Sequence, residues 1–401
     1  MPTGSSSDVR ERIPELDGLR GVAIGLVLLY HYFFLTIRCP PRTFLAYALT
    51  LGRLSWSGVD LFFVLSGFLI GGILLDARDA SNYFRVFYTR RFFRIVPIYG
   101  VLLATFLLAR SIVGSLSGTA FAWTVAEPMP FWTYLLFVQN FFMARAGSFG
   151  CNWLGVTWSL AIEEQFYLTL PSIVRFFSRK ALWTVVVTGI VAAPLVRTVL
   201  FRSSPSGWLA SYVLLFCRAD GLLFGVACAL LLRNPSWRQR ITTSGYVPGL
   251  LFLFISITAF LTKIGAGMTT LSMTSYGFTV LAALYACLLL IVCTRPGTLL
   301  AGVTRWSFLR WLGSIAYGAY LLHQPVQGVL FAILRKSAPS VEGIPSLLVT
   351  LLALSVTLAL AHISWNFFES RLVKFSHRAR YEFRALGDGL AGERVAVEAP
   401  R

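Results

Sequence analysis

Long runs of residues with almost no charge recur from Gly18 to Ala361, and they constrain this chain more than any other feature. A helix needs about 20 predominantly apolar residues to cross about 30 Å of hydrocarbon. Only 13% of the 401 residues are charged, against roughly a quarter in soluble domains. The sequence therefore predicts an all-α, polytopic transmembrane helix bundle.

Ten spans are predicted, at approximately residues 20–37, 57–76, 94–113, 157–177, 181–201, 210–232, 244–262, 275–294, 312–334 and 346–368. The apolar segment 131–143 is too short for another span, so we expect it to lie in the interface or to re-enter the membrane. Residues 1–17 are expected to form an N-terminal segment, 18–374 the membrane domain, and 375–401 a basic, partly disordered tail. No cleavage site follows the first apolar run, so no removable signal peptide is expected.

Positive charge is distributed unevenly between the two sets of loops. Of the 35 Lys and Arg residues, 24 flank one side of the predicted spans, ten flank the other side, Arg197 among them, and Arg218 falls inside a span. The positive-inside rule then places both termini in the cytoplasm, for a multi-pass protein of the cell (inner) membrane. This placement accounts for the net charge of +18 without a nucleic-acid partner.

The six cysteines include no CxxC pair and no cluster with histidine at metal-ligand spacing, so no metal site is expected. Cys39 and Cys151 fall in loops predicted on the same outer side. Whether they form a disulfide stays open at this point.

The first span carries Arg20 and His31, eleven residues apart. Eleven steps of about 100° leave a residual angle of about 20°, so the two side chains share a helix face. Ionisable residues inside spans are costly and usually face a cavity. The alternative is an interfacial Arg that snorkels and a buried histidine with purely structural contacts.

A second group of polar residues is Glu163 and Glu164, at the start of an otherwise apolar helix. Adjacent residues point about 100° apart, so at most one of them can face His31. A carboxylate beside an imidazole fixes its tautomer, and we favour Glu163 for that role. The alternative is that both acids simply interact with the helix dipole.

A third group is Arg90, Arg91 and Arg94, which precede an apolar run. Arg94 shares a face with each of the other two, and such a cluster suits phosphate groups. The alternative is a positively charged anchor for the span.

Other polar residues also fall inside predicted spans. Arg218 and Asp220 are two apart and cannot face each other on a helix, so pairing with other spans is their expected role. Tyr320 and His323 share a face and are either site residues or structural. Asp60 is a further candidate.

Seven segments together resemble the acyltransferase-3 family of integral membrane acyltransferases, over nearly the whole chain from Pro14 to Arg371. They are LDGLRGVAIGLVLLYH, GVDLFFVLSGFLIGGIL, YTRRFFRIVPIY, FVQNF, WSLAIEEQFYLTLP, RADGLLFG and SIAYGAYLLHQPV, in the family's order. The chain departs from the family at Phe368-Glu369-Ser370-Arg371, where the usual acid, basic residue and proline are replaced. The SGNH hydrolase-like domain of some members is not seen in these 401 residues, so no two-stage relay within one chain is expected.

The resemblance implies transfer of an acyl group, commonly acetyl, from cytoplasmic acyl-CoA to an acceptor reached from the outer side. It implies Arg20 and His31 as the essential pair, Glu163 as the matching acid, and CoA phosphates on Arg90, Arg91 and Arg94. As substrate-binding residues we predict Tyr320, His323, Asp60 and Asn140 of the FVQNF segment. No permanently bound cofactor is expected, and acyl-CoA is the predicted co-substrate.

The predicted mechanism has His31 as general base on the acceptor hydroxyl, or alternatively as carrier of the acyl group. The predicted acceptor is a carbohydrate or lipid-linked sugar, with a macrolide-type natural product as the alternative. A rival from another class is a proton-coupled secondary transporter in which His31 and Glu163 relay protons. A non-catalytic scaffold would leave the buried polar residues unexplained.

Overall fold

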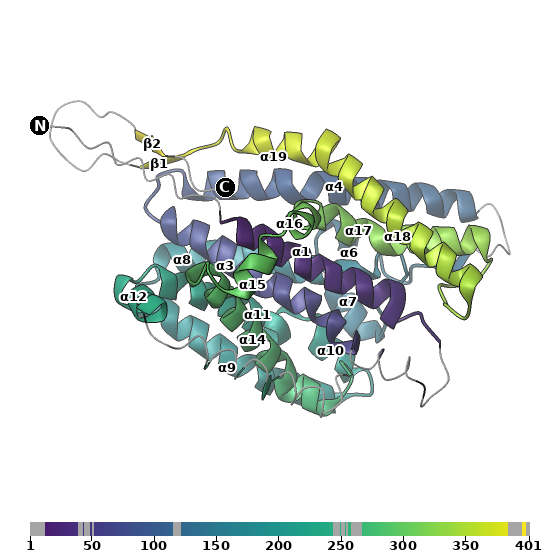
Figure 1. Cartoon of the computed structure of the whole chain (residues 1–401), viewed down its shortest axis with the longest axis horizontal. Coiled ribbons are helices and arrows are strands. Elements are labelled where there is room, and N and C mark those ends of the chain that lie inside the picture. Colours follow the sequence, from purple (N-terminus) through teal and green to yellow (C-terminus); the bar gives the residue numbers. More distant parts are fainter. Residues whose placement is uncertain are drawn as a thin grey trace, which may run out of the picture.

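The protein is described by a computed structural model covering residues 13–38, 52–114, 122–243, 267–383 and 395–397, with isolated positions 43, 49, 249, 253, 256 and 257. Figure 1 shows a bundle of helices, most of which run roughly along the long axis of the molecule. The predicted all-α bundle is confirmed for the described residues, which otherwise contain only two very short strands.

The first half of the bundle contains α1 (Pro14–Leu29), α3 (Gly58–Asp76), α4 (Tyr83–Gly114), α5 (Ala122–Val125), α6 (Trp132–Leu135), α7 (Gln139–Ala146) and α8 (Trp158–Phe176). The second half contains α9 (Arg179–Ser203), α10 (Gly207–Val213), α11 (Leu215–Leu232), α12 (Pro235–Thr243), α14 (Phe278–Thr294), α15 (Leu299–Thr304), α16 (Ser307–Ser314), α17 (Ala316–Leu334), α18 (Ile344–Ser364) and α19 (Ser370–Ser376). Strands β1 (Tyr381–Phe383) and β2 (Val395–Val397) pair antiparallel.

Several helices are extended by segments of different pitch. Three π-helical segments, Tyr30–Phe34, Met273–Gly277 and Trp365–Glu369, adjoin α1, α14 and α18. Two 3-10 segments, Arg53–Ser57 and Gly155–Thr157, lead into α3 and α8. The π-helical geometry matters at the end of α1, because it carries His31.

Six helical stretches among the described residues are long and apolar enough to cross a membrane. They are Leu54–Asp76, Tyr83–Val113, Arg179–Ser203, Gly207–Leu232, Met273–Thr294 and Ile344–Ser376. Of the other predicted spans, 20–37, 157–177 and 312–334 are largely helical but are not among these six, and most of 244–262 lies outside the described residues. The total of ten spans therefore stays a prediction.

Segment 131–143 forms two short helices, α6 and the start of α7, separated by a turn in which Phe137 has a φ of 54°. α6 has 4 residues and α7 has 8, so neither approaches the length needed to cross about 30 Å.

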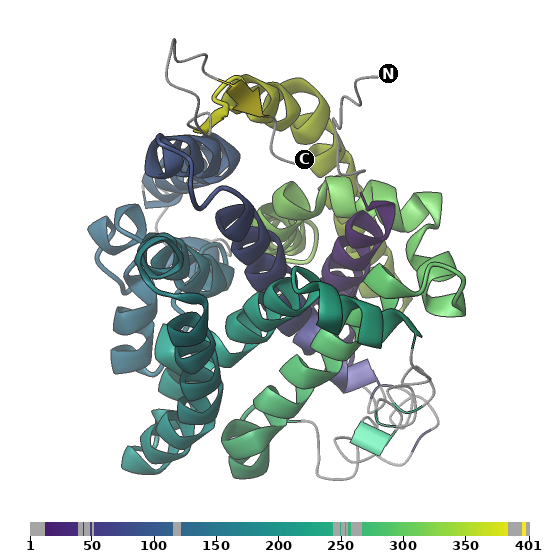
Figure 2. The ribbon, with the colours of Figure 1, turned by 90° about the vertical axis from the view of Figure 1, so that its left-hand side faces the viewer.

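Helices α3 and α11 form the centre of the bundle, and their glycines permit close contact. In the apolar windows of Leu54–Asp76 and Gly207–Leu232, 72% of residues are buried, against 17% in Arg179–Ser203. A Cβ at Gly67 would lie 1.8 Å from the Leu222 carbonyl oxygen, and one at Gly225 would lie 2.1 Å from that of Val64. Small residues of this kind let helix backbones approach within membranes. Figure 2 shows α3 near the middle of the bundle.

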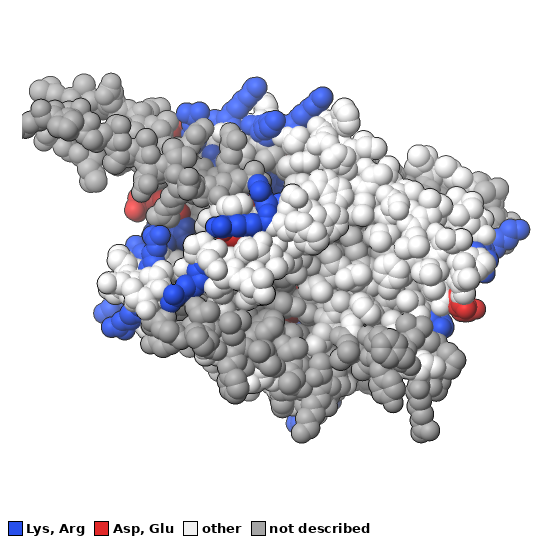
Figure 3. Space-filling model, viewed as in Figure 1, with Lys and Arg blue, Asp and Glu red and all other residues white. Residues whose placement is uncertain are grey.

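The segment after α19 packs against α4, the long helix along the top of Figure 1. Within the predicted tail, 375–401, residues up to Phe383 are described and docked, and the partial disorder of the tail stays a prediction. Figure 3 shows that, on this face, Lys and Arg gather toward the end that carries α12, while a broad band without charges covers the middle.

Candidate active site

A cavity of about 490 Å³ lies between α1, α3, α4, α8, α17 and the C-terminal residues. We call the part near Arg90, Arg91, Lys374, His377 and Tyr381 its mouth, and the part near Ser159 and Tyr320 its inner end. Five Lys and Arg residues line it, against two Asp and Glu residues. This excess of positive charge favours an anionic ligand.

The structure brings six of the predicted site residues together around this cavity: Arg20, Glu163, Arg90, Arg91, Arg94 and Tyr320. They come from four helices far apart in the sequence. The grouping shows that the cluster of arginines and the acid on α8 face one common space.

The three arginines of α4 differ in their surroundings. Arg90 is buried, and its Nε and Nη2 donate to the Ala379 carbonyl at 3.1 and 2.7 Å. Arg94 lies 5.3 Å from the Trp365 ring. Arg91 has a buried Nε with no hydrogen-bond partner among the residues that the structure covers. Arg90 is therefore largely an anchor for the C-terminal segment, whereas Arg91 has donor capacity left for a ligand.

Glu163 lies among positive charges rather than beside His31. Its Oε2 accepts from the Tyr167 hydroxyl at 3.2 Å, and the charges of Arg91 and Arg20 act on it. Tyr167 also makes a short hydrogen bond with Ser66. The predicted contact in which Glu163 orients His31 does not form in this structure, so that part of the prediction is corrected.

His31 lies in the π-helical segment that continues α1, and its orientation is set by the backbone. Its Nδ1 lies 2.9 Å from the Val27 carbonyl oxygen. Because a carbonyl can only accept, Nδ1 carries the proton and Nε2 keeps a lone pair. The neutral ring is therefore in the tautomer that a general base needs, although its partner is a carbonyl and not a carboxylate. π-helical turns are frequent at functional sites.

His31 is linked to the inner end of the cavity through two aromatic contacts. Its ring centroid lies 4.7 Å from that of His323, which lies 5.7 Å from that of Tyr320. The Tyr320 hydroxyl is 2.6 Å from the Ser159 hydroxyl and donates to the Val156 carbonyl at 2.9 Å. His31 itself does not line the cavity and is separated from Tyr320 by the ring of His323.

His323 is fully buried, with Nδ1 lying 2.6 Å from the Tyr320 carbonyl oxygen. Its Nε2 has no hydrogen-bond partner in the part of the chain that the structure describes. An unpartnered buried nitrogen costs about 1–3 kcal/mol, so this one suggests a functional use.

Two predicted substrate-binding residues lie away from the cavity and have structural partners. Asp60 forms a buried ion pair with Arg218. The Asn140 amide exchanges hydrogen bonds with the Gln165 amide, at 2.9 and 3.3 Å, and donates to the Val213 carbonyl. These partners give Asp60 and Asn140 structural roles in place of the predicted contact with the acceptor.

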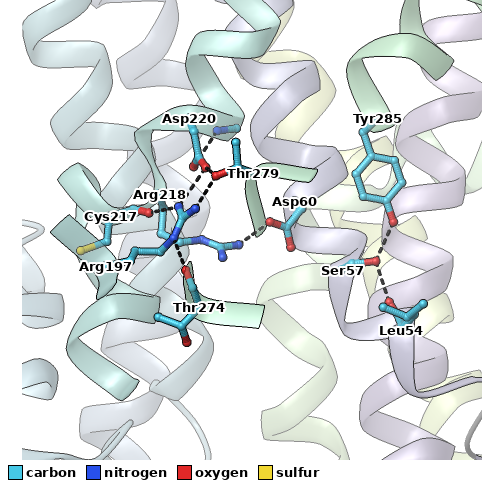
Figure 4. Close-up of polar contacts among 11 residues, drawn as sticks. Leu54, Ser57, Asp60, Arg197, Cys217, Arg218, Asp220, Thr274, Thr279 and Tyr285 are labelled. Atoms are coloured by element: carbon cyan, nitrogen blue, oxygen red, sulfur yellow. Dashed lines mark hydrogen bonds and ion pairs between the residues drawn. The ribbon is translucent and has the colours of Figure 1, made fainter. Parts of the chain in front are cut away.

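Arg197 was counted with the flanking loops, but the structure buries it completely. It forms an ion pair with Asp220 at 2.9 Å and donates to the Thr274 and Cys217 carbonyls and to Thr279. Figure 4 shows this group beside the Arg218–Asp60 pair. The expected role of Arg218 and Asp220 in pairs between helices is confirmed, and the flanking position of Arg197 is wrong.

Sequence reasoning missed several residues that line the cavity: Ser66, Ser159, Tyr167, Lys374, His377 and Tyr381. A signal existed for Ser159, which precedes Glu163 by four residues and so shares its helix face. No comparable signal existed for Tyr381, which follows α19 in a short strand.

Cys151 lies in the loop before α8, is buried, and forms no disulfide with any cysteine that the structure describes. Burial and the nearby Glu127 carboxylate raise the pKa of this thiol. Cys39 lies outside the described residues, so the pairing of Cys39 with Cys151 stays open.

The comparisons with known proteins agree with the resemblance noted in the motifs. The chain is 31% identical over 384 residues to a putative peptidoglycan O-acetyltransferase, YrhL, of Bacillus subtilis, covering 89% of this chain and 54% of that protein. It is 27% identical to the peptidoglycan O-acetyltransferase OatA of Listeria monocytogenes, covering 91% and 56%, and 26% identical to the O-acetyltransferase OatA of Staphylococcus aureus, covering 92% and 58%.

The chain thus spans about half the length of these curated relatives. No solved structure matches it. The model of the acyltransferase-3 family, described as an acyltransferase domain, matches residues 13–365, and the chain therefore belongs to this family of acyltransferases.

Proposed function

We propose that this protein is a membrane O-acyltransferase that moves an acetyl group from cytoplasmic acetyl-CoA to a hydroxyl of a carbohydrate or glycolipid acceptor. Relatives named as peptidoglycan O-acetyltransferases support the reaction class and a glycan acceptor. The acceptor class in the proposal is a surface or lipid-linked glycan.

One observation carries the proposal. The cavity has a positively charged mouth and an inner end at Tyr320, which lies one histidine ring away from His31. A molecule that is anionic at one end and carries a thioester at the other suits this arrangement. Phosphates interact well with arginines, and the cavity between them can hold the pantetheine arm.

In the proposed reaction, His31 Nε2 takes the proton from the acceptor hydroxyl as its oxygen attacks the thioester carbonyl. The carbon–sulfur bond breaks, and the CoA thiolate takes the proton back from the imidazolium. The carbonyl of Val27 holds the ring in the required tautomer. Arg20 and Glu163 border the path of the donor and complete its polar wall.

In this proposal the Glu163 carboxylate balances the positive charge of nearby arginines and does not contact the imidazole. Its contacts place it near Arg20, Arg91 and Tyr167. A single acid among several guanidinium groups reduces their mutual repulsion when no anionic ligand is bound. A carboxylate in this position also aligns the Tyr167 hydroxyl.

The orientation of the protein in the membrane is part of the proposal. The mouth of the cavity lies beside the N-terminal half of α4 and the C-terminal segment, whose flanks are rich in Lys and Arg. The positive-inside rule favours a cytoplasmic position for this end and for both termini. Acetyl-CoA would then enter from the cytoplasm, and the acceptor would approach from the opposite side.

The experiment is transfer of radiolabelled acetyl by purified protein in lipid nanodiscs. The acceptors are a peptidoglycan disaccharide fragment, a lipid-linked sugar and a macrolide. Label on either glycan supports the proposal, and label on the macrolide alone supports the alternative acceptor. If no acceptor gains label while proton-coupled uptake appears in sealed vesicles, the enzyme proposal is wrong and the transporter is right.

A further inference from the structure

Residues 374–383, here called the C-terminal strap, form one side of the mouth of the cavity. Lys374, His377 and Tyr381 of the strap all line it. The match to the acyltransferase family ends at residue 365. The strap is thus a part of the mouth that lies outside the matched region.

Hydrogen bonds to the backbone of the strap hold it against α4 and the two residues before that helix. Besides the two bonds from Arg90 to the Ala379 carbonyl, Asn82 Nδ2 donates to the Arg380 carbonyl at 2.9 Å and Asn82 Oδ1 accepts from the Glu382 amide at 3.0 Å. The Ser81 amide donates to the Glu382 carbonyl at 2.8 Å. These contacts fix the strap in place, as a binding wall requires.

Two donors at the mouth are buried and have no hydrogen-bond partner in the described ranges of the chain. The Tyr381 side chain is 1% exposed, and its hydroxyl has no hydrogen-bond partner among the described residues. The same holds for the Nε of Arg91. The Tyr381 ring lies 5.3 Å from the Arg90 guanidinium, and Arg91 also acts on this phenol through its charge. Unpartnered donors beside cationic side chains form a ready-made site for a phosphate oxygen.

We propose that the C-terminal strap completes a phosphate-binding site, in which the Tyr381 hydroxyl, Arg91, Lys374 and His377 bind the phosphate groups at the nucleotide end of acyl-CoA. This inference rests on the proposed function for the identity of the ligand. A phospholipid headgroup has the same phosphate chemistry and is the competing source. The size of the cavity, which extends from this mouth to Tyr320, favours the nucleotide of a long donor.

The test compares donors with and without a nucleotide. Acetyl-CoA and S-acetyl-pantetheine present the same thioester, but only the first reaches the strap. Tyr381→Phe keeps the ring under Arg90 and removes one donor to a charged group, so the KM for acetyl-CoA should rise about tenfold. Lys374→Gln should act in the same direction. For both variants kcat, and the KM for S-acetyl-pantetheine, should stay at the wild-type values.

The matched control is Lys336→Gln. Lys336 is exposed two residues beyond the far end of α17, and that helix spans about 28 Å from Ala316 at the cavity. It should leave both KM values unchanged. The inference is overturned if Tyr381→Phe leaves the KM for acetyl-CoA unchanged, or if it raises the KM for both donors equally.

A binding measurement separates this inference from the proposed function. Adenosine 3′,5′-bisphosphate carries the phosphates without a thioester, and its affinity can be measured by calorimetry even if no acetyl is transferred. If the wild-type protein binds this compound and Tyr381→Phe weakens the affinity about tenfold, the proposed role of the strap is supported, whether or not acetyl transfer is detected. Equal affinity in both proteins overturns it. The inference is also overturned if Tyr381→Phe alters only the response of the protein to phosphatidylglycerol in the nanodisc, because the ligand would then be a lipid.

Asn82 provides a second test, since it holds the strap but does not line the cavity. It is a positioning residue in this account. Asn82→Ala should raise the KM for acetyl-CoA and leave kcat and the KM for S-acetyl-pantetheine unchanged. A parallel fall in kcat for both donors would indicate a general structural role and contradict the inference.

Discussion

The buried ion pair between Arg197 of α9 and Asp220 of α11 should contribute strongly to the stability of the bundle. Both side chains are nearly inaccessible, with exposed fractions of 0% and 3%. Breaking a buried pair by removing one partner typically costs about 3–5 kcal/mol, because the other charge remains without compensation. Arg197 keeps three neutral acceptors after Asp220→Asn, so we expect about 3 kcal/mol, at the lower end of that range.

The pair also bears on the site, because α11 packs closely on α3, which contributes Val59, Phe62 and Ser66 to the cavity wall. Arg197→Met should lower the free energy of unfolding by about as much as Asp220→Asn. The double variant removes both charges, and we expect it to cost only about 1 kcal/mol.

The assay is reversible unfolding in mixed micelles titrated with sodium dodecyl sulfate, followed by tryptophan fluorescence. Arg202→Met is the matched control, since Arg202 is exposed near the end of the same helix, and it should change stability by less than about 0.5 kcal/mol. The reasoning is refuted if Asp220→Asn costs no more than Arg202→Met, or if the two single effects simply add in the double variant.

The remaining predictions concern the mouth, the helix packing and the loop thiol. Arg91→Glu should raise the KM for acetyl-CoA at least about tenfold, because the mouth attracts anions. For the same reason the wild-type KM should rise with salt concentration. A KM that changes neither with the substitution nor with salt would contradict this role. Gly67→Ala should destabilise the bundle by about 2 kcal/mol, since its Cβ would overlap the backbone of α11, whereas Gly100→Ala has nothing within 4 Å and should be neutral or slightly stabilising; thermal unfolding of the two proteins side by side decides this. Cys151 should resist maleimide at pH 8 under reducing conditions, because its raised pKa keeps the thiol protonated in a buried site; modification of the native protein at the rate of a free thiol, detected by mass spectrometry, would contradict it.

The sequence was most informative where chemistry and helix periodicity coincide. Arg20 and Glu163 fall inside predicted spans, where the cost of a buried charge predicts that they face a cavity, and Arg91 belongs to the predicted phosphate-binding cluster. The structure places all three on one cavity. The spacing rules also correctly separated Arg218 from Asp220.

The sequence was least informative where a contact depends on how helices rotate against one another. The assignment of Glu163 to His31 failed because helical spacing fixes angles within a helix but not between α8 and the π-helical end of α1. Arg197 was misplaced for a related reason. A count of flanking charges cannot reveal that Arg197 has an ion-pair partner, Asp220, on another helix.

The C-terminal strap could not be predicted for a different physical reason. Its composition is polar and basic, which indicates disorder. The contacts that order it go to backbone atoms, from Asn82 and Arg90 to the carbonyls of Arg380 and Ala379. Contacts to the backbone leave no pattern in the sequence of the strap itself.

The central claim is that the His31 imidazole acts as general base on an acceptor hydroxyl, which attacks an acyl thioester delivered through the positively charged mouth. His31→Asn tests it most directly, because Asn can keep a donor toward the Val27 carbonyl while it removes Nε2. The control is His362→Asn, whose exposed ring contacts Trp311 and does not line the cavity. The measurement is transfer of labelled acetyl from acetyl-CoA to the glycan acceptor in nanodiscs. The account predicts a loss of at least about a hundredfold in kcat for His31→Asn and wild-type activity for the control, and wild-type transfer by folded His31→Asn protein would contradict it.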